Sequence, residues 1–199
     1  MSIARGLVGW WRLDGNLTDA SGNGNNLTAT GSPDYIAGRY GQGVQLDGST
    51  KWLGLDAPYT FSNPSTFSAW INFGRVSTSP EYFLGGSGSD LRGARYNSTN
   101  FLINDGSAGP YVTVSWEKVS GYVFFVMRRT SSTAYDIWIN GVNIGGGNSA
   151  TSTSISVDFI GRRGREVLAA NIDIDNAMIY NRALSPSEIK TLYALGSPI

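Results

Sequence analysis

Short apolar stretches of about four to eight residues recur along the whole chain, and clusters of glycine, serine, threonine and asparagine separate them. These stretches are rich in β-branched and aromatic residues, which favour strands over helices. The clearest are Gly6–Leu13, Lys51–Leu55, Thr66–Phe73, Gly121–Arg128, Tyr135–Ile139, Ile155–Ile160 and Asn171–Tyr180. Many short strands between turns predict an all-β sandwich of about ten or more strands.

Two stretches also predict how their strands are placed. In Thr66–Phe73, apolar residues occupy alternate positions from Phe67 to Phe73, so they should share one face of a strand. Asn140 and Gly141 stand between two further strand-like runs. Both residue types tolerate a positive φ, so the pair predicts a two-residue hairpin.

One helix is predicted near the C-terminus. Ser185 suits the N-cap, and Pro186 suits the first helical position, where its missing N–H costs nothing. Glu188 completes a capping box with Ser185, and Gly196 can end the helix. A helix of about three turns needs to pack on the sandwich to be stable.

The chain contains no cysteine and no histidine, which removes most catalytic chemistry. Disulfides, thiolate zinc sites and Ser-His-Asp triads are excluded, whereas carboxylate-based glycosidase chemistry and calcium binding stay open. Lys+Arg and Asp+Glu both number 15, so there is no basic surplus for nucleic acid. No apolar run approaches a membrane-spanning length, and no secretory signal is visible. We therefore expect neither nucleic-acid binding nor membrane insertion.

The most specific motifs lie near the two ends of the chain. Gly6–Gly48 contains Trp-Trp-Arg-Leu-Asp, then Asp-Ala-Ser-Gly-Asn-Gly-Asn-Asn, then Gly-Arg-Tyr-Gly-Gln-Gly-Val-Gln-Leu-Asp-Gly. Asn171–Ile189 contains Ile-Asp-Ile-Asp followed by Ile-Tyr-Asn-Arg-Ala-Leu-Ser. The weaker motifs Phe67–Trp70 (Phe-Ser-Ala-Trp) and Ile139–Gly141 (Ile-Asn-Gly) lie between them. In this order the motifs resemble laminin-G-like members of the concanavalin A-like lectin/glucanase superfamily.

The resemblance spans essentially the whole chain. It implies one jelly-roll domain over residues 1–199, with two antiparallel sheets, and a role in binding or adhesion, since most of the family is non-catalytic. Two departures weaken any transfer of site residues. A family strand with two adjacent histidines reads Gly-Tyr-Val-Phe-Phe-Val from Gly121, and the usual adjacent aspartates are spaced as Asp173 and Asp175.

The resemblance also implies a structural calcium ion where the N-terminal loop meets the last strand. The candidate ligands are Asp19, Asn23, Asn25, Asp173 and Asp175. Oxygen ligands on a flexible backbone suit calcium, but the run that begins at Asp19 equally suits an Asx-type turn. We favour the turn, leave a structural calcium ion open as the alternative, and expect no other cofactor.

Asn171, Asp173 and Asp175 alternate, so their side chains should project from one face of a strand. Two carboxylates about 5 Å apart suit a retaining glycosidase. The laminarinase-type glucanases of the superfamily, however, use glutamates that flank an aspartate on a mid-chain strand. We therefore expect these residues to tie the last strand to the N-terminal loop and predict no catalytic residue.

Exposed aromatic rings beside polar groups are what a sugar-binding site needs. Trp70 and Trp138 lie in strand-like stretches, so we expect them to be packed. Tyr82, Tyr96 and Tyr111 lie beside loop-rich sequence and are our candidate glycan-binding residues.

These observations lead to one preferred function and two alternatives. Phage fibres, spikes and decoration proteins similar to this family favour a non-catalytic protein on a virion surface, in a capsid decoration, head fibre or tail fibre. Its expected partners are other capsid or tail proteins and cell-surface polysaccharide, with the protein present as a homo-oligomer or multicopy array. The alternatives are a free, extracellular bacterial carbohydrate-binding module and a small endoglucanase that uses Asp173 and Asp175.

Overall fold

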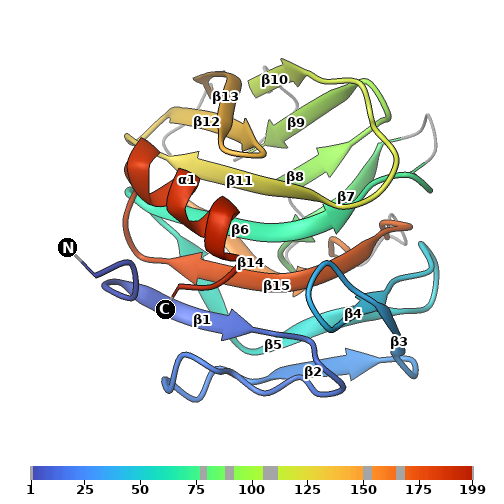
Figure 1. The fold of residues 1–199 in the computed structure, drawn as a ribbon. Helices are drawn as coiled ribbons and strands as arrows, with labels where there is room; N and C mark the ends of the chain where they lie inside the picture. Colours follow the sequence, from blue (N-terminus) through green and yellow to red (C-terminus); the bar gives the residue numbers. More distant parts are fainter. Residues whose placement is uncertain are drawn as a thin grey trace.

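The computed structural model describes residues 2–76, 80–87, 92–104, 112–149, 154–164 and 169–198. In this part of the chain, 15 strands form two antiparallel sheets that pack face to face, and one helix lies on the outer side of one sheet (Figure 1). The predicted fold class, an all-β jelly-roll sandwich with one short C-terminal helix, is confirmed.

The first sheet has eight strands. Seven of them follow one another in the order β13 (Val142–Asn148), β12 (Ala134–Ile139), β11 (Val123–Arg129), β6 (Ser65–Asn72), β15 (Asp173–Tyr180), β4 (Gln42–Gln45) and β3 (Asp34–Ala37). The eighth, β1 (Leu7–Trp11), pairs with β15. The strand β15 therefore has β6 along one edge, and it has β4 and β1 along the other.

The second sheet has seven strands. Their order is β10 (Val112–Ser115), β9 (Asn100–Asn104), β8 (Gly93–Tyr96), β7 (Glu81–Gly85), β14 (Ile155–Ile160), β5 (Trp52–Phe61) and β2 (Leu27–Thr30).

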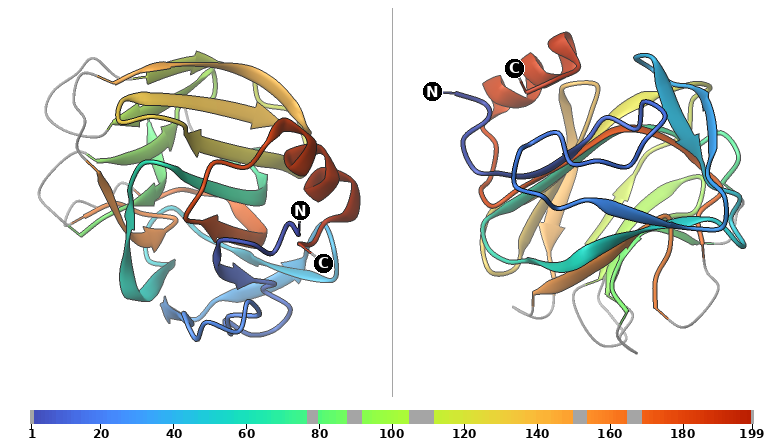
Figure 2. Two further views of the ribbon diagram at one scale, coloured as in Figure 1. Left: turned by 90° about the vertical axis from the view of Figure 1, so that its left-hand side faces the viewer. Right: turned by 90° about the horizontal axis from the view of Figure 1, so that it is seen from below.

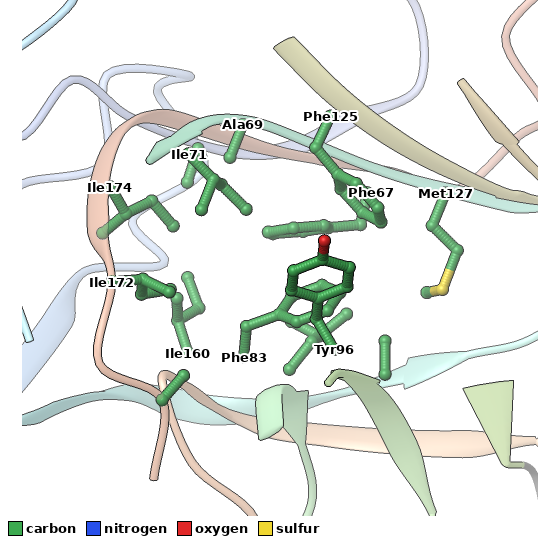
Figure 3. Packing of buried hydrophobic residues seen from close by; sticks show 14 of the residues in the cluster. Phe67, Ala69, Ile71, Phe83, Tyr96, Phe125, Met127, Ile160, Ile172 and Ile174 are labelled. Carbon is green, nitrogen blue, oxygen red and sulfur yellow. The ribbon is translucent and has the colours of Figure 1, made fainter. Parts of the chain in front are cut away.

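The two sheets enclose the main hydrophobic core (Figure 3). Phe67, Ala69 and Ile71 of β6 all point into it, as their alternate spacing predicts. Phe83 of β7 packs edge-on against Phe125 of β11 with 5.1 Å between ring centroids, so aromatic contact crosses from one sheet to the other. Burial of apolar surface, worth about 25 cal/mol per Å², is the main force that holds the layers together.

The first and last strands lie side by side, as Figure 1 shows. Trp10 of β1 is opposite Met178 of β15, and Trp11 is opposite Ala177. The expected role of the last strand in closing the fold onto the N-terminal segment is confirmed. The predicted hairpin is also present: Asn140 and Gly141 have φ values of 51° and 79° and join β12 to β13.

The helix α1 (Pro186–Leu195) has the predicted ends. The Ser185 side chain accepts the N–H of Glu188, whose carboxylate accepts the N–H of Ser185. Gly196 ends the helix with a φ of 73°. The helix forms a third layer on the first sheet (Figure 2). A second hydrophobic cluster fills the space between them, made of Trp10, Trp70, Phe124, Val126, Trp138, Met178, Tyr180, Leu184, Ile189 and Leu192.

Candidate functional site

A pocket of about 350 Å³ opens beside α1 on the outer side of the first sheet. We call it the terminal pocket because most of its lining comes from the two ends of the chain. It is lined by Trp10, Arg12, Asp14, Tyr40, Gly41, Asn176, Leu195, Gly196 and Ser197. The volume lies within the range of small-ligand sites. Three other pockets in the described residues have no aromatic lining, and one of them continues from Arg12 and Asp14 toward Thr18.

Trp10 is 8 % exposed and lines one side of the terminal pocket. Its neighbour Trp11 faces the main core, because successive side chains of a strand point to opposite faces. The indole N–H of Trp10 donates to Oδ1 of Asn176 at 2.9 Å. Asn176 has a φ of 47° within an irregularity of β15, which interrupts the pairing with β6 between Asp175 and Met178. The two terminal strands thus hold this side of the pocket together.

Tyr40 forms another wall and is 37 % exposed. Its ring meets Trp70 edge-on with 5.7 Å between centroids. It also lies against Gly196, where a Cβ atom would come within 2.3 Å of the ring. Only glycine fits at this helix end, so the C-terminus of α1 and the β3–β4 turn form one continuous wall.

Arg12 and Asp14 bring opposite charges to the rim of the pocket. Their side chains form an ion pair with 3.1 Å between Nη2 and Oδ2. The Arg12 guanidinium lies 5.9 Å from the Trp10 ring centroid, and Oδ1 of Asp14 accepts the backbone N–H of Gln42 at 2.8 Å. Both side chains are partly open to solvent, so the rim offers donors and acceptors beside two aromatic rings.

Asp175 lies beneath the pocket wall and is fully buried. Its Oδ2 accepts the backbone N–H of Tyr40 at 2.9 Å, and its Oδ1 accepts Nδ2 of Asn176 at 3.1 Å. Burial raises the pKa of Asp175 to about 6, with a smaller contribution in the same direction from Asp14, although the backbone amides of Tyr40 and Arg39 oppose it. Asp175 therefore positions the pocket wall and cannot itself touch a ligand.

The candidate metal ligand Asp19 is saturated by protein donors. Oδ1 accepts the N–H groups of Trp10 and Ser21, and Oδ2 accepts the Ser21 hydroxyl and the N–H of Asn25. The side-chain NH₂ groups of Asn23 and Asn25 face backbone carbonyls of β1. Burial alone would raise the pKa of Asp19, yet these hydrogen bonds outweigh it and hold the pKa below its ordinary value. The geometry fits the Asx-type turn.

Asp173 lies in different surroundings, although it shares a strand with Asp175. Its carboxylate pairs with Arg75 at 2.5 Å and accepts hydrogen bonds from Asn72 and Gln45. No three acidic side chains within the described ranges lie close enough to hold a metal ion together. Asp19 and Asp173 are therefore held by different protein donors, and the calcium site stays a sequence-based prediction. Asp173 and Asp175, the pair named in the endoglucanase alternative, are both buried and do not line the terminal pocket.

The expectation that Tyr82 and Tyr96 are exposed is wrong. Both are 0 % exposed. Tyr96 lies in the main core, and Tyr82 lies on the outer side of the second sheet, where Arg95 and Arg163 cover its ring. Neither ring face is open to a sugar. Tyr111, the third candidate, lies outside the described residues.

Sequence reasoning did not identify Trp10, Tyr40 or Asn176 as site residues. One signal was present: adjacent tryptophans in a strand point to opposite faces, so one of Trp10 and Trp11 had to leave the main core. A second was that all three belong to the terminal motifs that carry the family resemblance. No local pattern, however, shows that residues so far apart in sequence meet.

A sequence model described as "Concanavalin A-like lectin/glucanases superfamily" matches residues 47–190. The chain belongs to this superfamily. No curated protein matches it significantly in sequence. Among the described residues, no helix of this superfamily member is long and apolar enough to span a membrane.

Solved structures with a similar fold include a domain of an arabinanase, a binding domain of a mosquitocidal protein and a sialidase. Domain 4 of AbnA, an extracellular arabinanase from Geobacillus stearothermophilus solved with arabinotriose, has a TM-score of 0.69 at 20 % identity, with 94 % of this chain and 98 % of that one covered. The binding domain of Paraclostridial Mosquitocidal Protein 1 has a TM-score of 0.72 at 16 % identity, with 96 % and 52 % covered. The Trypanosoma rangeli sialidase has a TM-score of 0.68 at 20 % identity, with 94 % and 32 % covered. This chain thus spans about half of the toxin domain and a third of the sialidase.

Proposed function

We propose that the protein is a non-catalytic carbohydrate-binding domain that takes a sugar unit in the terminal pocket. The observation that carries this proposal is the half-exposed Tyr40 ring beside the Arg12–Asp14 pair. The apolar face of a sugar ring can stack on Tyr40, while its hydroxyls exchange hydrogen bonds with the guanidinium and the carboxylate.

Preorganisation of the pocket supports this role. Tyr40 is fixed by Trp70, by Gly196 and by its hydrogen bond to Asp175, and Trp10 is fixed by Asn176. A site whose walls are already in place loses little side-chain entropy when a ligand binds. The solved structures of similar fold include an arabinanase domain in complex with arabinotriose and a sialidase, which supports carbohydrate as the ligand class.

The placement of acidic residues favours binding over hydrolysis. The one acidic side chain that lines the terminal pocket is Asp14, and it is paired with Arg12. A glycosidase needs two carboxyl groups on opposite sides of the scissile bond. The buried carboxylate of Asp175 accepts a hydrogen bond from the backbone of Tyr40, and the pocket wall covers it.

The setting on a virion surface, with capsid or tail partners and several copies, stays a sequence-based prediction within this proposal. It rests on the use of domains of this superfamily in phage fibres, spikes and decoration proteins, and no residue pattern of this chain carries it. Finding the protein by mass spectrometry in purified phage particles would support it, and a free extracellular protein would contradict it.

The binding itself is tested with a glycan array followed by calorimetric titration of the best oligosaccharide. Tyr40→Ala should weaken binding by about tenfold or more, because it removes the exposed ring. Tyr40→Phe is the matched control, because it keeps the ring and its packing on Trp70. Failure of the wild-type protein to bind any glycan, or equal affinity in Tyr40→Ala, would overturn the proposal.

A further inference from the structure

An aromatic surface continues from the terminal pocket along α1. Its exposed rings are Tyr40 and Tyr193, whose centroids lie 5.7 Å and 5.6 Å from that of Trp70, which is buried beneath them. Tyr40 and Tyr193 are each 37 % exposed. A ligand longer than one sugar unit can therefore leave the pocket over Tyr40 and stay in contact with aromatic side chains.

Arg39 lies over this surface. Its guanidinium carbon is 4.9 Å from the Trp70 centroid and 5.5 Å from the Tyr40 centroid. Its backbone N–H is held by the carboxylate of Asp175. The main chain of this exposed residue is thus held by Asp175, and its guanidinium lies within cation–π distance of two aromatic rings.

The guanidinium of Arg39 has no ion pair or hydrogen bond within the described part of the chain. Its situation differs from that of Arg12, Arg75 and Arg128, which are paired with Asp14, Asp173 and Asp136. A guanidinium that stacks by its face keeps its N–H edge available for a bidentate contact with an anion. The surface therefore offers a positive charge with no ion-pair partner among the described residues, beside two aromatic rings at the side of the pocket.

We propose that Arg39 forms a second subsite that selects acidic saccharides, with the carboxylate of a uronic acid unit bound at its N–H edge. This inference rests on the proposed function, because the preceding sugar unit occupies the terminal pocket. The negative charges nearby do not oppose it strongly: Asp14 is paired with Arg12, and Asp175 is buried beneath the turn.

The test compares two probes that differ in charge: tetragalacturonic acid and its fully methyl-esterified, uncharged form. Calorimetric titrations use the wild-type protein, Arg39→Met and Arg5→Met. Methionine keeps an apolar side chain over Trp70 and removes the charge. Arg5 is an exposed arginine before β1, so its substitution is the control for a change in total charge. Melting temperatures confirm that all three proteins are folded.

We expect the wild-type protein and Arg5→Met to bind the acid about tenfold more tightly than the ester, and Arg39→Met to lose this preference because it binds the acid more weakly. The preference should also shrink as sodium chloride is raised, because salt screens exposed charges. Equal binding of both probes by the wild-type protein, or a preference that survives in Arg39→Met, would overturn the acidic subsite and leave the carbohydrate-binding proposal intact. No binding of these probes or of any glycan would overturn both.

Discussion

The buried carboxylate of Asp175 accepts the backbone N–H of Tyr40 at 2.9 Å, which joins residues 135 positions apart in the chain. One end of this bond belongs to the last strand, and the other belongs to the turn that forms a wall of the terminal pocket. The charge state of a single inaccessible side chain therefore bears on the shape of the site.

The first prediction concerns the pH dependence of stability. The pKa of Asp175 is raised to about 6 in the folded protein, so between about pH 4 and pH 6 the folded state holds a proton that the unfolded state has released. The contribution of Asp175 to the free energy of unfolding is therefore greatest below the pKa that this carboxyl has in the unfolded chain. That contribution is lost as the pH rises through about 6. Asp175→Asn stays neutral at every pH. The free energy of unfolding of this variant minus that of the wild type should therefore rise by about 2 kcal/mol from pH 4 to pH 7, as measured by urea unfolding.

In that experiment, the informative quantity is the difference in the free energy of unfolding between the wild-type protein and Asp175→Asn. Asp19 and Glu188 have pKa values below their ordinary range, so they stabilise the fold more as the pH rises. Their contribution is common to both proteins and cancels in the difference. A difference that does not change with pH would contradict the assignment.

The second prediction concerns the contact between α1 and Tyr40. Gly196→Ala places a Cβ atom within 2.3 Å of the ring at a position whose φ is 73°, so both a clash and backbone strain result. We expect a loss of about 2–4 kcal/mol in the free energy of unfolding. Gly121→Ala is the matched control: its φ is 83° and nothing lies within 4 Å, so only the strain of about 1–2 kcal/mol applies. Equal losses in the two variants would show that the ring moves aside freely.

The third prediction concerns the loop after β1. Asp19→Ala removes an acceptor of four hydrogen bonds and leaves the buried N–H of Trp10 without its partner. The free energy of unfolding should fall by about 2–4 kcal/mol in urea titrations. Asp34→Ala, which removes an exposed carboxylate paired with Lys51, should cost less than about 1 kcal/mol. The prediction fails if both substitutions cost the same.

The fourth prediction concerns calcium. Each Asp19 oxygen already accepts two hydrogen bonds, so an ion could bind there only by displacing them. We expect the melting temperature to be the same in EDTA and in excess calcium. A ligand that binds the folded state raises the melting temperature by mass action, so an increase in calcium would restore the calcium hypothesis.

The strands and the helix were predictable because their signals are local. The apolar residues between Phe67 and Phe73 alternate within one strand, and Ser185 caps a helix only three residues before Glu188. The resemblance of the terminal motifs to the family also predicted that the two ends of the chain lie together, which no local pattern indicates.

The site could not be predicted in the same way, because it depends on contacts between distant segments. The loop-rich neighbourhood of Tyr82 predicts a surface residue, but Arg163, 81 positions later, covers its ring and donates to its hydroxyl. Tyr40 forms a wall of the pocket because its backbone N–H donates to Asp175 and its ring lies against Gly196, and both of these residues are more than a hundred positions away.

The location of Gly196 and Ser197 on the pocket wall has a practical consequence. A purification tag or fusion partner joined behind these residues would emerge at the entrance to the terminal pocket and compete with ligands for the same space. The N-terminus lies near the C-terminus in all the ribbon views, so an attachment before Ile3 would leave from the same side of the molecule (Figures 1 and 2).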